Sequence, residues 1–315
     1  MSDWGGKRLL VTGGAGFIGA ALVRALLEAG ADVTVADLRA AADPRVRSVV
    51  GDLGQPEVLD EALEAGTDGV FHLAAFTSVL RSVERPDEAY QANVAVTAAV
   101  LERARKVQAQ GVLLASTNAV VGDVGRNPIT ERLPLLPLSP YGATKAAAEV
   151  LLSAYHGSYG MTTASLRLTN VYGPGMARKD SFVPRLMRAA LSGKPVQIYG
   201  DGEQVRDYVH VDDVVAAFRL AWSSGVVGPL IVGSGRSVSV NHLVGAARKA
   251  TGAALPVGHV GAKAGEMPAV IVDIARAQSL GFAPAFTLEA GLRSAWDYFR
   301  GMSATEKRTA EGERG

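Results

Sequence analysis

The sequence predicts an α/β protein built on a doubly wound parallel sheet, with a smaller α/β lobe in its C-terminal part. Through residues 1–170, short β-branched or apolar runs alternate with longer amphipathic runs. This alternation is typical of βαβ units with helices on both faces of a sheet. A glycine-rich turn separates the first two runs. The 315 residues are 48% hydrophobic, which is sufficient to bury a large core.

The elements of this first part follow from the spacing of apolar side chains. Runs of three to six apolar or β-branched residues predict strands, and the longer runs between them predict helices. The first strand ends because Thr12-Gly13-Gly14 interrupts it. In chain order the predicted elements are a strand at 9–11, a helix at 17–29, strands at 33–36 and 46–50, a helix at 57–65, a strand at 70–73, a helix at 87–108, a strand at 112–115, a helix at 141–159 and a strand at 163–168.

The regular alternation loosens after residue 170. Four helices are predicted there, at 181–193, 211–223, 239–250 and 287–299, and Gly/Pro-rich segments separate them. Such loops at the carboxyl edge of a sheet commonly build a second lobe. We therefore expect a first domain over 1–170, to which some later segments return, and a substrate-binding lobe over 171–300. The charged segment 301–315 lacks an apolar period and predicts a disordered tail.

Composition narrows the classes of partner. Lys and Arg number 32 and Asp and Glu 31, so the net charge of +1 gives no reason to expect a nucleic acid or an anionic membrane. The absence of cysteine excludes disulfides, thiolate metal sites and cysteine nucleophiles. The five histidines show no metal-ligand spacing, so no metal is expected. The first apolar run is too short for a signal peptide or a membrane span, which predicts a cytoplasmic protein.

The turn Gly14-Ala-Gly16-Phe-Ile-Gly19 follows a predicted strand and opens a helix. This context predicts a dinucleotide site, because glycines permit a tight turn and the helix N-terminus attracts a pyrophosphate. Asp37 ends the second strand, eighteen positions after Gly19. A carboxylate there accepts hydrogen bonds from both ribose hydroxyls of NAD and repels a 2′-phosphate, although Arg39 leaves some room for NADP.

Tyr141 and Lys145 are four positions apart in a predicted helix. Side chains at this spacing project from one face, so a phenol and an ammonium can serve one reaction. The hydroxyl pair Ser116-Thr117 lies upstream. The arrangement predicts acid–base chemistry.

Five segments in order resemble the extended short-chain dehydrogenase/reductase family, and within it the nucleotide-sugar epimerases and dehydratases, most of all the UDP-hexose or UDP-hexuronate 4-epimerases. These segments are Thr12-Gly-Gly-Ala-Gly-Phe-Ile-Gly19, His72-Leu-Ala-Ala75, Tyr141-x-x-x-Lys145, Arg167-Leu-Thr-Asn-Val-Tyr-Gly-Pro174 and Gly200-Asp-Gly-Glu-Gln-Val-Arg-Asp-Tyr-Val-His-Val-Asp-Asp213. The resemblance implies a Rossmann domain that keeps NAD bound, and a smaller lobe that binds the nucleotide-diphosphate sugar.

The resemblance also implies roles for individual residues. Thr117, Tyr141 and Lys145 are the expected catalytic residues. The expected cofactor-binding residues are Gly13, Gly14, Gly16, Phe17, Ile18, Gly19, Asp37, Asp52, Leu53, Leu73, Ala74, Ala75, Asn93, Tyr141 and Lys145. Two interpretations are open for Asn93: it supports the active-site backbone, or it is an ordinary exposed residue of the helix. The expected substrate-binding residues are Thr77, Arg81, Thr117, Asn170, Arg178, Val183, Arg206, Lys263 and Glu266.

Three departures from the family pattern are visible. Dehydratases of the family carry Asp-Glu after the catalytic threonine, whereas this chain has Asn118 and Ala119, which cannot shuttle the extra proton. Val121 replaces a tyrosine. Lys263 and Glu266 replace an arginine and an aspartate, and lysine lacks the bidentate fork of arginine.

These features predict an isomerase, an NAD-dependent 4-epimerase that acts through a transient 4-keto sugar. Lys145 and the positive nicotinamide are expected to lower the pKa of Tyr141 from about 10. UDP-glucose/UDP-galactose is the first choice of sugar pair, and UDP-glucuronate/UDP-galacturonate is the second, because Arg81 or Arg178 could pair with a carboxylate. For each arginine, a solvated surface position is the favoured interpretation. A related oxidoreductase or decarboxylase and a silent NAD-binding regulator remain as alternatives.

Two further expectations concern residues outside the reaction. His72 and His210 are expected to be structural rather than catalytic, because His72 follows an apolar run. The helices at 87–108 and 141–159 are expected to pair with their copies, since the resembling family builds a homodimer through a four-helix contact.

Overall fold

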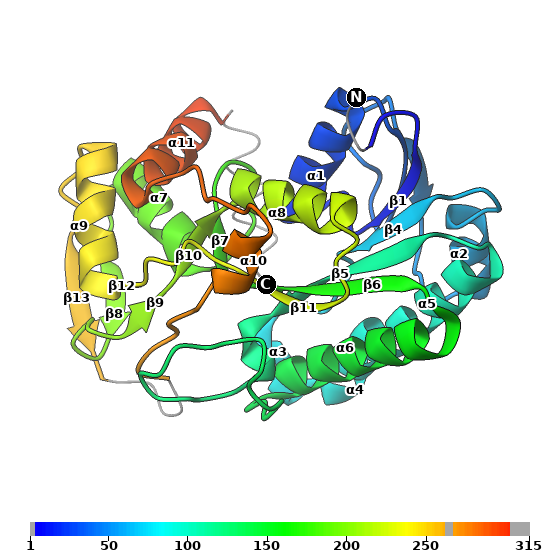
Figure 1. Ribbon diagram of the computed structural model, residues 1–315. Coiled ribbons are helices and arrows are strands. Elements are labelled where there is room, and N and C mark those ends of the chain that lie inside the picture. Colours follow the sequence, from blue (N-terminus) through cyan, green and yellow to red (C-terminus); the bar gives the residue numbers. More distant parts are fainter. Residues whose placement is uncertain (1–3, 262–266, 303–315) are drawn as a thin grey trace.

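The computed structural model describes residues 4–261 and 267–302. These residues form a large α/β part around one long sheet and a smaller lobe beside it (Figure 1). Predictions for Lys263, Glu266 and the segment 303–315 lie outside the described residues. No helix among the described residues is long and apolar enough to cross a membrane.

The central sheet has seven parallel strands in the order β11-β6-β5-β4-β1-β2-β3. This arrangement confirms the predicted doubly wound α/β fold. Six strands occupy the predicted places, and the seventh, β11, comes from beyond residue 170. Their bounds are β1 Arg8–Thr12, β2 Asp32–Asp37, β3 Arg47–Val50, β4 Gly69–His72, β5 Gly111–Thr117, β6 Thr162–Leu168 and β11 Gly228–Val232.

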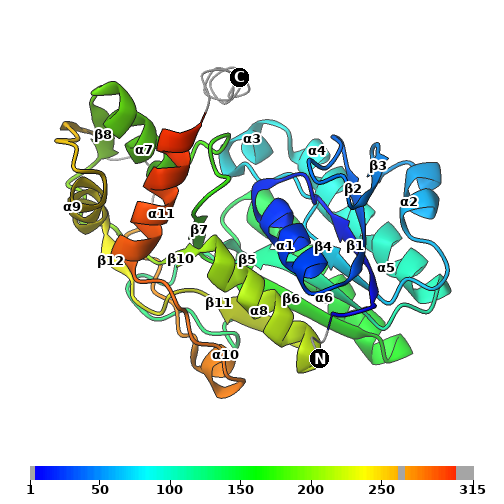
Figure 2. The ribbon, with the colours of Figure 1, turned by 90° about the horizontal axis from the view of Figure 1, so that it is seen from above.

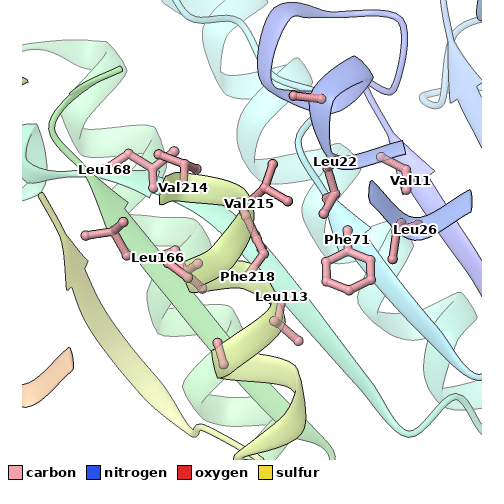
Figure 3. Close-up of a cluster of buried hydrophobic side chains, with 14 of the residues drawn as sticks. Val11, Leu22, Leu26, Phe71, Leu113, Leu166, Leu168, Val214, Val215 and Phe218 are labelled. Carbon is pink, nitrogen blue, oxygen red and sulfur yellow. The ribbon is translucent and has the colours of Figure 1, made fainter. Parts of the chain in front are cut away.

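One face of the sheet is covered by α1 (Phe17–Glu28) and α8 (Val211–Ser223), which pack against each other. Strand residues alternate between faces, so Leu9 and Val11 join this core while Leu10 joins the other. Figure 3 shows the cluster on the first face, in which Phe71 lies between the helical residues Leu22 and Phe218. Burying one such side chain contributes about 1.5–3 kcal/mol. This core therefore fixes α1, whose N-terminus borders the site described below.

The opposite face is covered by α2 (Pro56–Ala62), α5 (Val96–Lys106) and α6 (Pro140–Tyr159). Figure 2 shows α1 and α8 in front of the sheet with α5 and α6 behind it. The helix α6 is the longest, and Pro140 at its first position and Gly160 at its C-cap mark its ends.

The predicted helix over 87–108 is not continuous. A short helix, α4 (Pro86–Tyr90), leads into a π-helical turn, η1 (Gln91–Ala95), and then into α5. A further helix that the sequence pattern did not predict, α3 (Val79–Glu84), precedes them. The extra residue per turn in a π-helix shifts the side chains that follow, which a period of 3.6 residues does not reveal. A short 3₁₀ turn, η2 (Asn118–Val120), follows β5.

The smaller lobe has its own hydrophobic core, which includes Met187, Leu243 and Phe299. Its helices are α7 (Phe182–Ser192), α9 (Val240–Thr251) and α11 (Leu288–Gly301), and a short helix, α10 (Ala275–Ser279), packs on β11. Its strands form three pairs. These pairs are β7 (Asn170–Tyr172) with β10 (Tyr208–His210), β9 (Val205–Arg206) with β12 (Val238–Ser239), and β8 (Val196–Tyr199) with β13 (Val257–Val260).

Strand β1 lies at the point where the chain reverses direction across the sheet. The chain adds β2 and β3 on one side of β1 and then crosses to place β4 on the other side. The carboxyl ends of β1 and β4 therefore lie side by side, with Thr12 beside His72. Open α/β sheets bind ligands in the crevice outside such a switch point.

Candidate active site

A cavity of about 1110 Å³ opens at this switch point. Its walls come from the turns after β1 to β6 and from the facing side of the smaller lobe. A cavity of this size can hold an extended ligand such as a dinucleotide. Among the described residues, no group of His, Cys, Asp or Glu side chains is arranged to hold a metal ion.

The glycine turn after β1 is packed too tightly for side chains. A Cβ atom on Gly13, whose φ is +71°, would lie 2.6 Å from the backbone nitrogen of Ala74, and one on Gly14 would lie 2.7 Å from Val35 Cγ1. A Cβ atom on Gly19 would overlap the carbonyl oxygen of Gly13. The turn therefore brings bare backbone and the N-terminus of α1 to the cavity.

The fit of this turn to a pyrophosphate can be tested on the structure. The cavity wall there consists of Gly13, Gly16, Phe17, Ile18 and Gly19, whereas Gly14 is not part of it. The first turn of α1 carries no acidic residue, and its N-cap makes no side-chain hydrogen bond. The unpaired N–H groups and the positive end of the helix dipole are consequently available to an anion.

Asp37 stands beside this turn at the end of β2 and lines the cavity. Its Oδ2 accepts a hydrogen bond from the Ala15 N–H (3.0 Å), and its Oδ1 accepts one from the Arg39 N–H (3.2 Å). Burial raises the pKa of Asp37, and hydrogen bonds from the backbone of Ala15 and Leu38 lower it. The carboxylate thus holds the glycine turn in place and is also part of the cavity wall.

The remaining predicted contacts of the adenosine and nicotinamide ends also reach the cavity. Asp52, Leu53, Leu73, Ala74 and Ala75 all belong to its wall. Asp52 accepts a hydrogen bond from the backbone of Gly54 at 2.9 Å, which fixes its side chain in the turn after β3.

Asn93 is placed differently from the other predicted cofactor contacts. It lies in the π-helical turn, 1% exposed, and does not line the cavity. Its Oδ1 accepts from the Phe76 N–H (2.8 Å), and its Nδ2 donates to the Phe76 carbonyl (3.0 Å) and to Thr144 Oγ1 (2.9 Å). Two of these hydrogen bonds hold the backbone of the cavity wall at Phe76, which agrees with the interpretation that Asn93 supports the active-site backbone. Direct contact with the cofactor stays a prediction.

His72 is fully buried beneath the cavity. Its Nδ1 lies 2.7 Å from Thr12 Oγ1 and its Nε2 lies 3.0 Å from Thr97 Oγ1. Burial, assisted by the charge of Lys145, lowers the pKa of His72 to about 3. The histidine is therefore neutral at working pH and ties β4 to β1 and to α5, in agreement with its expected structural role.

Thr117, Tyr141 and Lys145 come together on the cavity wall. Ser139 caps α6 by accepting from the Gly142 N–H (3.2 Å), which sets Tyr141 in the first turn of this helix. One turn later, the buried Lys145 donates from Nζ to the carbonyl of Ala115 at 3.0 Å. The Tyr141 side chain is hydrogen-bonded to Thr117 at the end of β5. A phenol, a hydroxyl and an ammonium thus meet at one end of the cavity.

Burial dominates the electrostatics of this cluster. Burial raises the pKa of Tyr141, and the hydrogen bond from Thr117 lowers it, so the shift caused by the protein is upward. Burial lowers the pKa of Lys145 to about 8, while the charge of Glu149 raises it. The predicted downward shift of the Tyr141 pKa depends on the positive nicotinamide as well as on Lys145, and it stays a prediction for the complex with NAD.

Of the nine predicted substrate contacts, five line the cavity, two do not, and Lys263 and Glu266 lie outside the described residues. Thr77, Thr117, Asn170, Val183 and Arg206 belong to its wall. Arg81 instead lies over the ring of Phe76, with its guanidinium carbon 5.6 Å from the ring centroid. The cations that line the cavity come instead from the region of residues 179–185, which the sequence did not predict.

Arg178 is exposed and lies outside the cavity wall, whereas the next residue, Lys179, is part of it. Arg185 also lines the cavity, and it is paired with Asp180 at 2.9 and 2.6 Å. The sequence could not show which of the adjacent residues Arg178 and Lys179 faces the cavity. In an irregular loop, no regular spacing indicates the direction of a side chain.

The residues that depart from the dehydratase pattern turn away from the cavity. Asn118 is 5% exposed and donates from Nδ2 to the carbonyl of Leu168 at 3.3 Å. Neither Asn118 nor Ala119 lines the cavity. Val121 is 3% exposed and packs in a cluster with Ile129 and Val272. The valine therefore fills a hydrophobic core at the place where the family pattern has a tyrosine.

Comparisons with known proteins agree with this site. Residues 9–232 match the model of the NAD dependent epimerase/dehydratase family. The chain is 33% identical to the UDP-glucose 4-epimerase of Corynebacterium glutamicum, with 92% of this chain and 95% of the relative covered. It is also 36% identical to a dTDP-glucose 4,6-dehydratase of Streptomyces griseus, with 91% and 93% covered.

Two solved structures are also closely similar. UDP-glucose 4-epimerase from Thermotoga maritima with UDP-glucose superimposes with a TM-score of 0.88 at 33% identity and covers 93% of this chain and 98% of its own. MoeE5 in complex with UDP-glucuronic acid and NAD gives a TM-score of 0.84 at 37% identity, with 93% and 98% covered.

These matches confirm the resemblance to the extended short-chain dehydrogenase/reductases, the Rossmann-type fold and the prediction of NAD as cofactor. The family match covers more than two thirds of the sequence and includes the glycine turn and the Tyr141 and Lys145 pair. The chain belongs to the NAD dependent epimerase/dehydratase family, whose members similar to it include isomerases of the UDP-sugar 4-epimerase type.

Proposed function

We propose that this chain is a nucleotide-sugar 4-epimerase that inverts C4 of a UDP-hexose through a transient 4-keto intermediate. One observation carries the proposal: Thr117, Tyr141 and Lys145 share a single cavity with the glycine turn and Asp37. The first group can move a proton, and the second fits a dinucleotide. The activities named for similar proteins of nearly full coverage favour the same reaction.

In this proposal, one set of cavity residues binds NAD and another set binds the sugar nucleotide. Gly13, Gly16 and the N-terminus of α1 hold the pyrophosphate of NAD, and Asp37 holds its adenosine ribose. Asn170 and Arg206, at the lobe side of the cavity, hold the diphosphate of the sugar nucleotide. The division corresponds to a cofactor domain over residues 1–170 and a substrate lobe over 171–300.

NAD, when bound, supplies the hydride acceptor and returns the hydride later. Tyr141 removes the proton of the sugar 4-hydroxyl, and Thr117 hydrogen-bonds the same oxygen. Lys145 contributes a positive charge at the same end of the cavity, which favours the phenolate over the phenol. Because burial alone raises the pKa of Tyr141, the positive charges around it have to overcome this effect in the working complex.

Inversion requires that the keto sugar present its other face to the cofactor. A diphosphate held by the lobe can remain in place while the hexose turns about its linkage. Tyr141 then returns the proton to the C4 oxygen, so neither the substrate mass nor the redox state of the cofactor changes overall. Dehydration at C6 is disfavoured, because Asn118 and Ala119 offer no acid or base to the cavity.

UDP-glucose and UDP-galactose are the first choice of substrate pair. UDP-glucuronate and UDP-galacturonate are the second, because Lys179 lines the cavity and could pair with a carboxylate. MoeE5 has been solved with UDP-glucuronic acid and also with UDP-glucose, so the similarity to it is compatible with both pairs. No specific observation favours a net oxidoreductase, a decarboxylase or a silent regulator.

We further propose a homodimer in the cytoplasm. The helices α3, α4 and α6 pack together and expose the apolar side chains Val83, Tyr90 and Val150, which are 63%, 52% and 57% exposed. A second copy of this surface would cover them. Light scattering on the purified protein would reveal a monomer if this part of the proposal were wrong.

Product analysis tests the central proposal. The purified protein is incubated with UDP-glucose, UDP-galactose, UDP-glucuronate, UDP-galacturonate and dTDP-glucose in turn, and the products are identified by NMR. Formation of the C4 epimer without net NADH is expected for at least one UDP-sugar. A keto sugar, released CO₂ or a 4-keto-6-deoxy sugar as the main product would contradict the proposal.

A further inference from the structure

Two consecutive residues of β5 are held by charged side chains of α6. The carbonyl of Ala115 accepts from Lys145 Nζ at 3.0 Å, and Ser116 Oγ donates to Glu149 Oε1 at 2.5 Å. The residue that follows on β5 is Thr117, the expected catalytic hydroxyl. Lys145 and Glu149 therefore fix the register between this strand and the helix that carries Tyr141.

Glu149 lies in the interior and is fully engaged. Its side chain is 6% exposed and that of Arg167, on β6, is 3% exposed. Arg167 Nη2 donates to Oε2 at 2.7 Å, and Nε lies 3.1 Å from both carboxylate oxygens. A buried carboxylate needs such a partner to remain ionised. Ser116 and Arg167 thus hold a negative charge at a fixed place behind the cavity wall, because Glu149 itself does not line the cavity.

This negative charge lies one helical turn from Lys145, whose charged form burial disfavours. Glu149 follows Lys145 by four positions on α6, so the two side chains project from the same face of the helix. Burial lowers the pKa of Lys145 to about 8, and the charge of Glu149 acts in the opposite direction. His72, which approaches Lys145 from β4, is uncharged because burial lowers its pKa to about 3. Tyr141 is the titrating group one turn earlier on α6.

We propose that Glu149 is a positioning residue for the reaction: its fixed carboxylate keeps Lys145 protonated and hydrogen-bonded to β5. It acts through Lys145 and contacts neither substrate nor cofactor. Arg167 acts on Lys145 only through Glu149, because it pairs with the buried carboxylate and so holds it in the ionised form. The kinetic part of the inference rests on the proposed function, whereas the charge state of Lys145 does not.

The test compares a variant that removes the carboxylate with one that keeps both the carboxylate and a cationic partner for it. The protein loaded with NAD is studied as wild type, Glu149→Gln and Arg167→Lys. The titration midpoint of Lys145 is read from the NMR signal of its side-chain ammonium, which is assigned by its loss in Lys145→Met. We expect Glu149→Gln to lower the midpoint by about one pH unit or more. Arg167→Lys, which keeps a cation beside the carboxylate, is expected to leave the midpoint close to that of wild type.

The alkaline limb of the pH profile of kcat/KM should follow the same order. It moves to lower pH in Glu149→Gln and does not do so in Arg167→Lys. Glu61→Gln is the matched control, because Glu61 is an exposed carboxylate on α2 that pairs weakly with Arg47 at 3.8 Å. This variant should leave both the midpoint and the limb unchanged.

A purely structural role of Glu149 predicts a different result. Both variants would then lose stability and activity with no movement of the Lys145 midpoint, and this outcome overturns the inference. Should Glu149→Gln fail to fold, the double variant Glu149→Gln/Arg167→Met, which lacks the carboxylate, is compared with wild type and is expected to have the lower midpoint. The double variant is expected to fold, since replacing both members of a buried pair is tolerated better than removing one. An equal midpoint in these two proteins also overturns the inference.

The two proposals can fail separately. A wild-type protein that epimerises none of the sugars removes the proposed function, while the NMR midpoint still decides the role of Glu149. Normal epimerisation with a Lys145 midpoint that ignores the Glu149→Gln exchange removes this inference alone.

Discussion

The side-chain amide of Asn93 accepts one hydrogen bond from the backbone of Phe76 and donates another to it, as a neighbouring β-strand would. Its Oδ1 accepts from the Phe76 N–H at 2.8 Å, and its Nδ2 donates to the Phe76 carbonyl at 3.0 Å. Phe76 and its neighbours from 73 to 77 form one wall of the cavity. A buried amide in a π-helical turn therefore determines the shape of a wall that it does not reach.

Replacement of Asn93 by alanine tests this arrangement. The change leaves the two polar backbone groups of Phe76 without their partner, and each such group typically costs about 1–3 kcal/mol when it stays buried. We expect the free energy of unfolding to fall by about 2 kcal/mol or more, measured by urea denaturation, with weakened NAD binding. Unchanged stability together with unchanged NAD affinity would show that the wall does not depend on Asn93.

Replacement of Tyr141 by phenylalanine removes the acid–base group and leaves the ring in place. Turnover of the UDP-sugar should fall by about 10²–10⁴-fold or more, which is the usual contribution of general acid–base catalysis. NAD binding, followed by fluorescence titration, should remain close to that of wild type. Thr117→Val is the companion variant and should reduce kcat without abolishing it. Near-normal activity of Tyr141→Phe would exclude the assignment of this residue.

Asp37 is expected to determine the choice between NAD and NADP. Asp37→Asn keeps an oxygen for the Ala15 N–H but removes the negative charge that opposes a 2′-phosphate. Hydrogen bonds to charged groups contribute about 1.5–3 kcal/mol, so we expect NAD affinity to fall by roughly 10-fold or more. NADP affinity should rise relative to NAD in the same calorimetric titrations. Asp52→Asn provides the control, and an equal effect at both positions would contradict the special role of Asp37.

Stability should decrease in mild acid because of His72. Its folded-state pKa of about 3 lies below the ordinary value of 6.5, so the unfolded chain binds the proton more readily. The stability linked to this group is therefore complete above pH 6.5 and is lost as the pH falls toward 3. At 1.36 kcal/mol per pKa unit, the loss between pH 6.5 and 5 is about 2 kcal/mol.

Urea denaturation at a series of pH values measures this dependence. His72→Gln removes the titrating group and should give a shallower slope between pH 6.5 and 5, whatever its absolute stability. Parallel slopes for the variant and the wild type would assign the acid sensitivity to other groups, such as His210, whose pKa burial also lowers.

A substitution at Lys179 can distinguish between the two proposed substrate pairs. If the substrate is a uronate, Lys179→Gln should reduce kcat/KM for UDP-galacturonate by about tenfold or more, because hydrogen bonds to charged groups contribute about 1.5–3 kcal/mol. UDP-galactose should be affected far less. Arg178→Gln is the matched control, since this neighbouring cation lies outside the cavity wall. Equal losses with neutral and acidic sugars would argue against a carboxylate contact at Lys179.

The regular part of the fold could be predicted from the sequence because its signals are local. Each strand up to β6 is a short apolar run, and Gly13, Gly14 and Gly19 occupy places where the structure leaves no room for a Cβ atom. The spacing of Tyr141 and Lys145 likewise needs only a helical period. These features depend on neighbours in the chain and are therefore visible in it.

The rest depends on contacts between distant segments. The π-helical turn at Asn93 is tied to Phe76 and Thr144, seventeen and fifty-one positions away. The upward shift in the pKa of Tyr141 comes from burial by the folded chain, which no local pattern encodes. Whether Arg178 or Lys179 enters the cavity is decided by an irregular loop between two packed elements.

The strand β11 has a consequence for how the protein can be made. It pairs with β6 along the full length from Gly228 to Val232, and α8 packs on α1 just before it in the chain. A polypeptide that ends near residue 170 would leave the β6 edge unpaired, and such edges promote aggregation. During ribosomal synthesis the sheet consequently stays incomplete until residue 232 has emerged. Dissecting this protein into two expressible halves should therefore fail at the obvious boundary, and any successful split would have to carry β11 along with the N-terminal fragment.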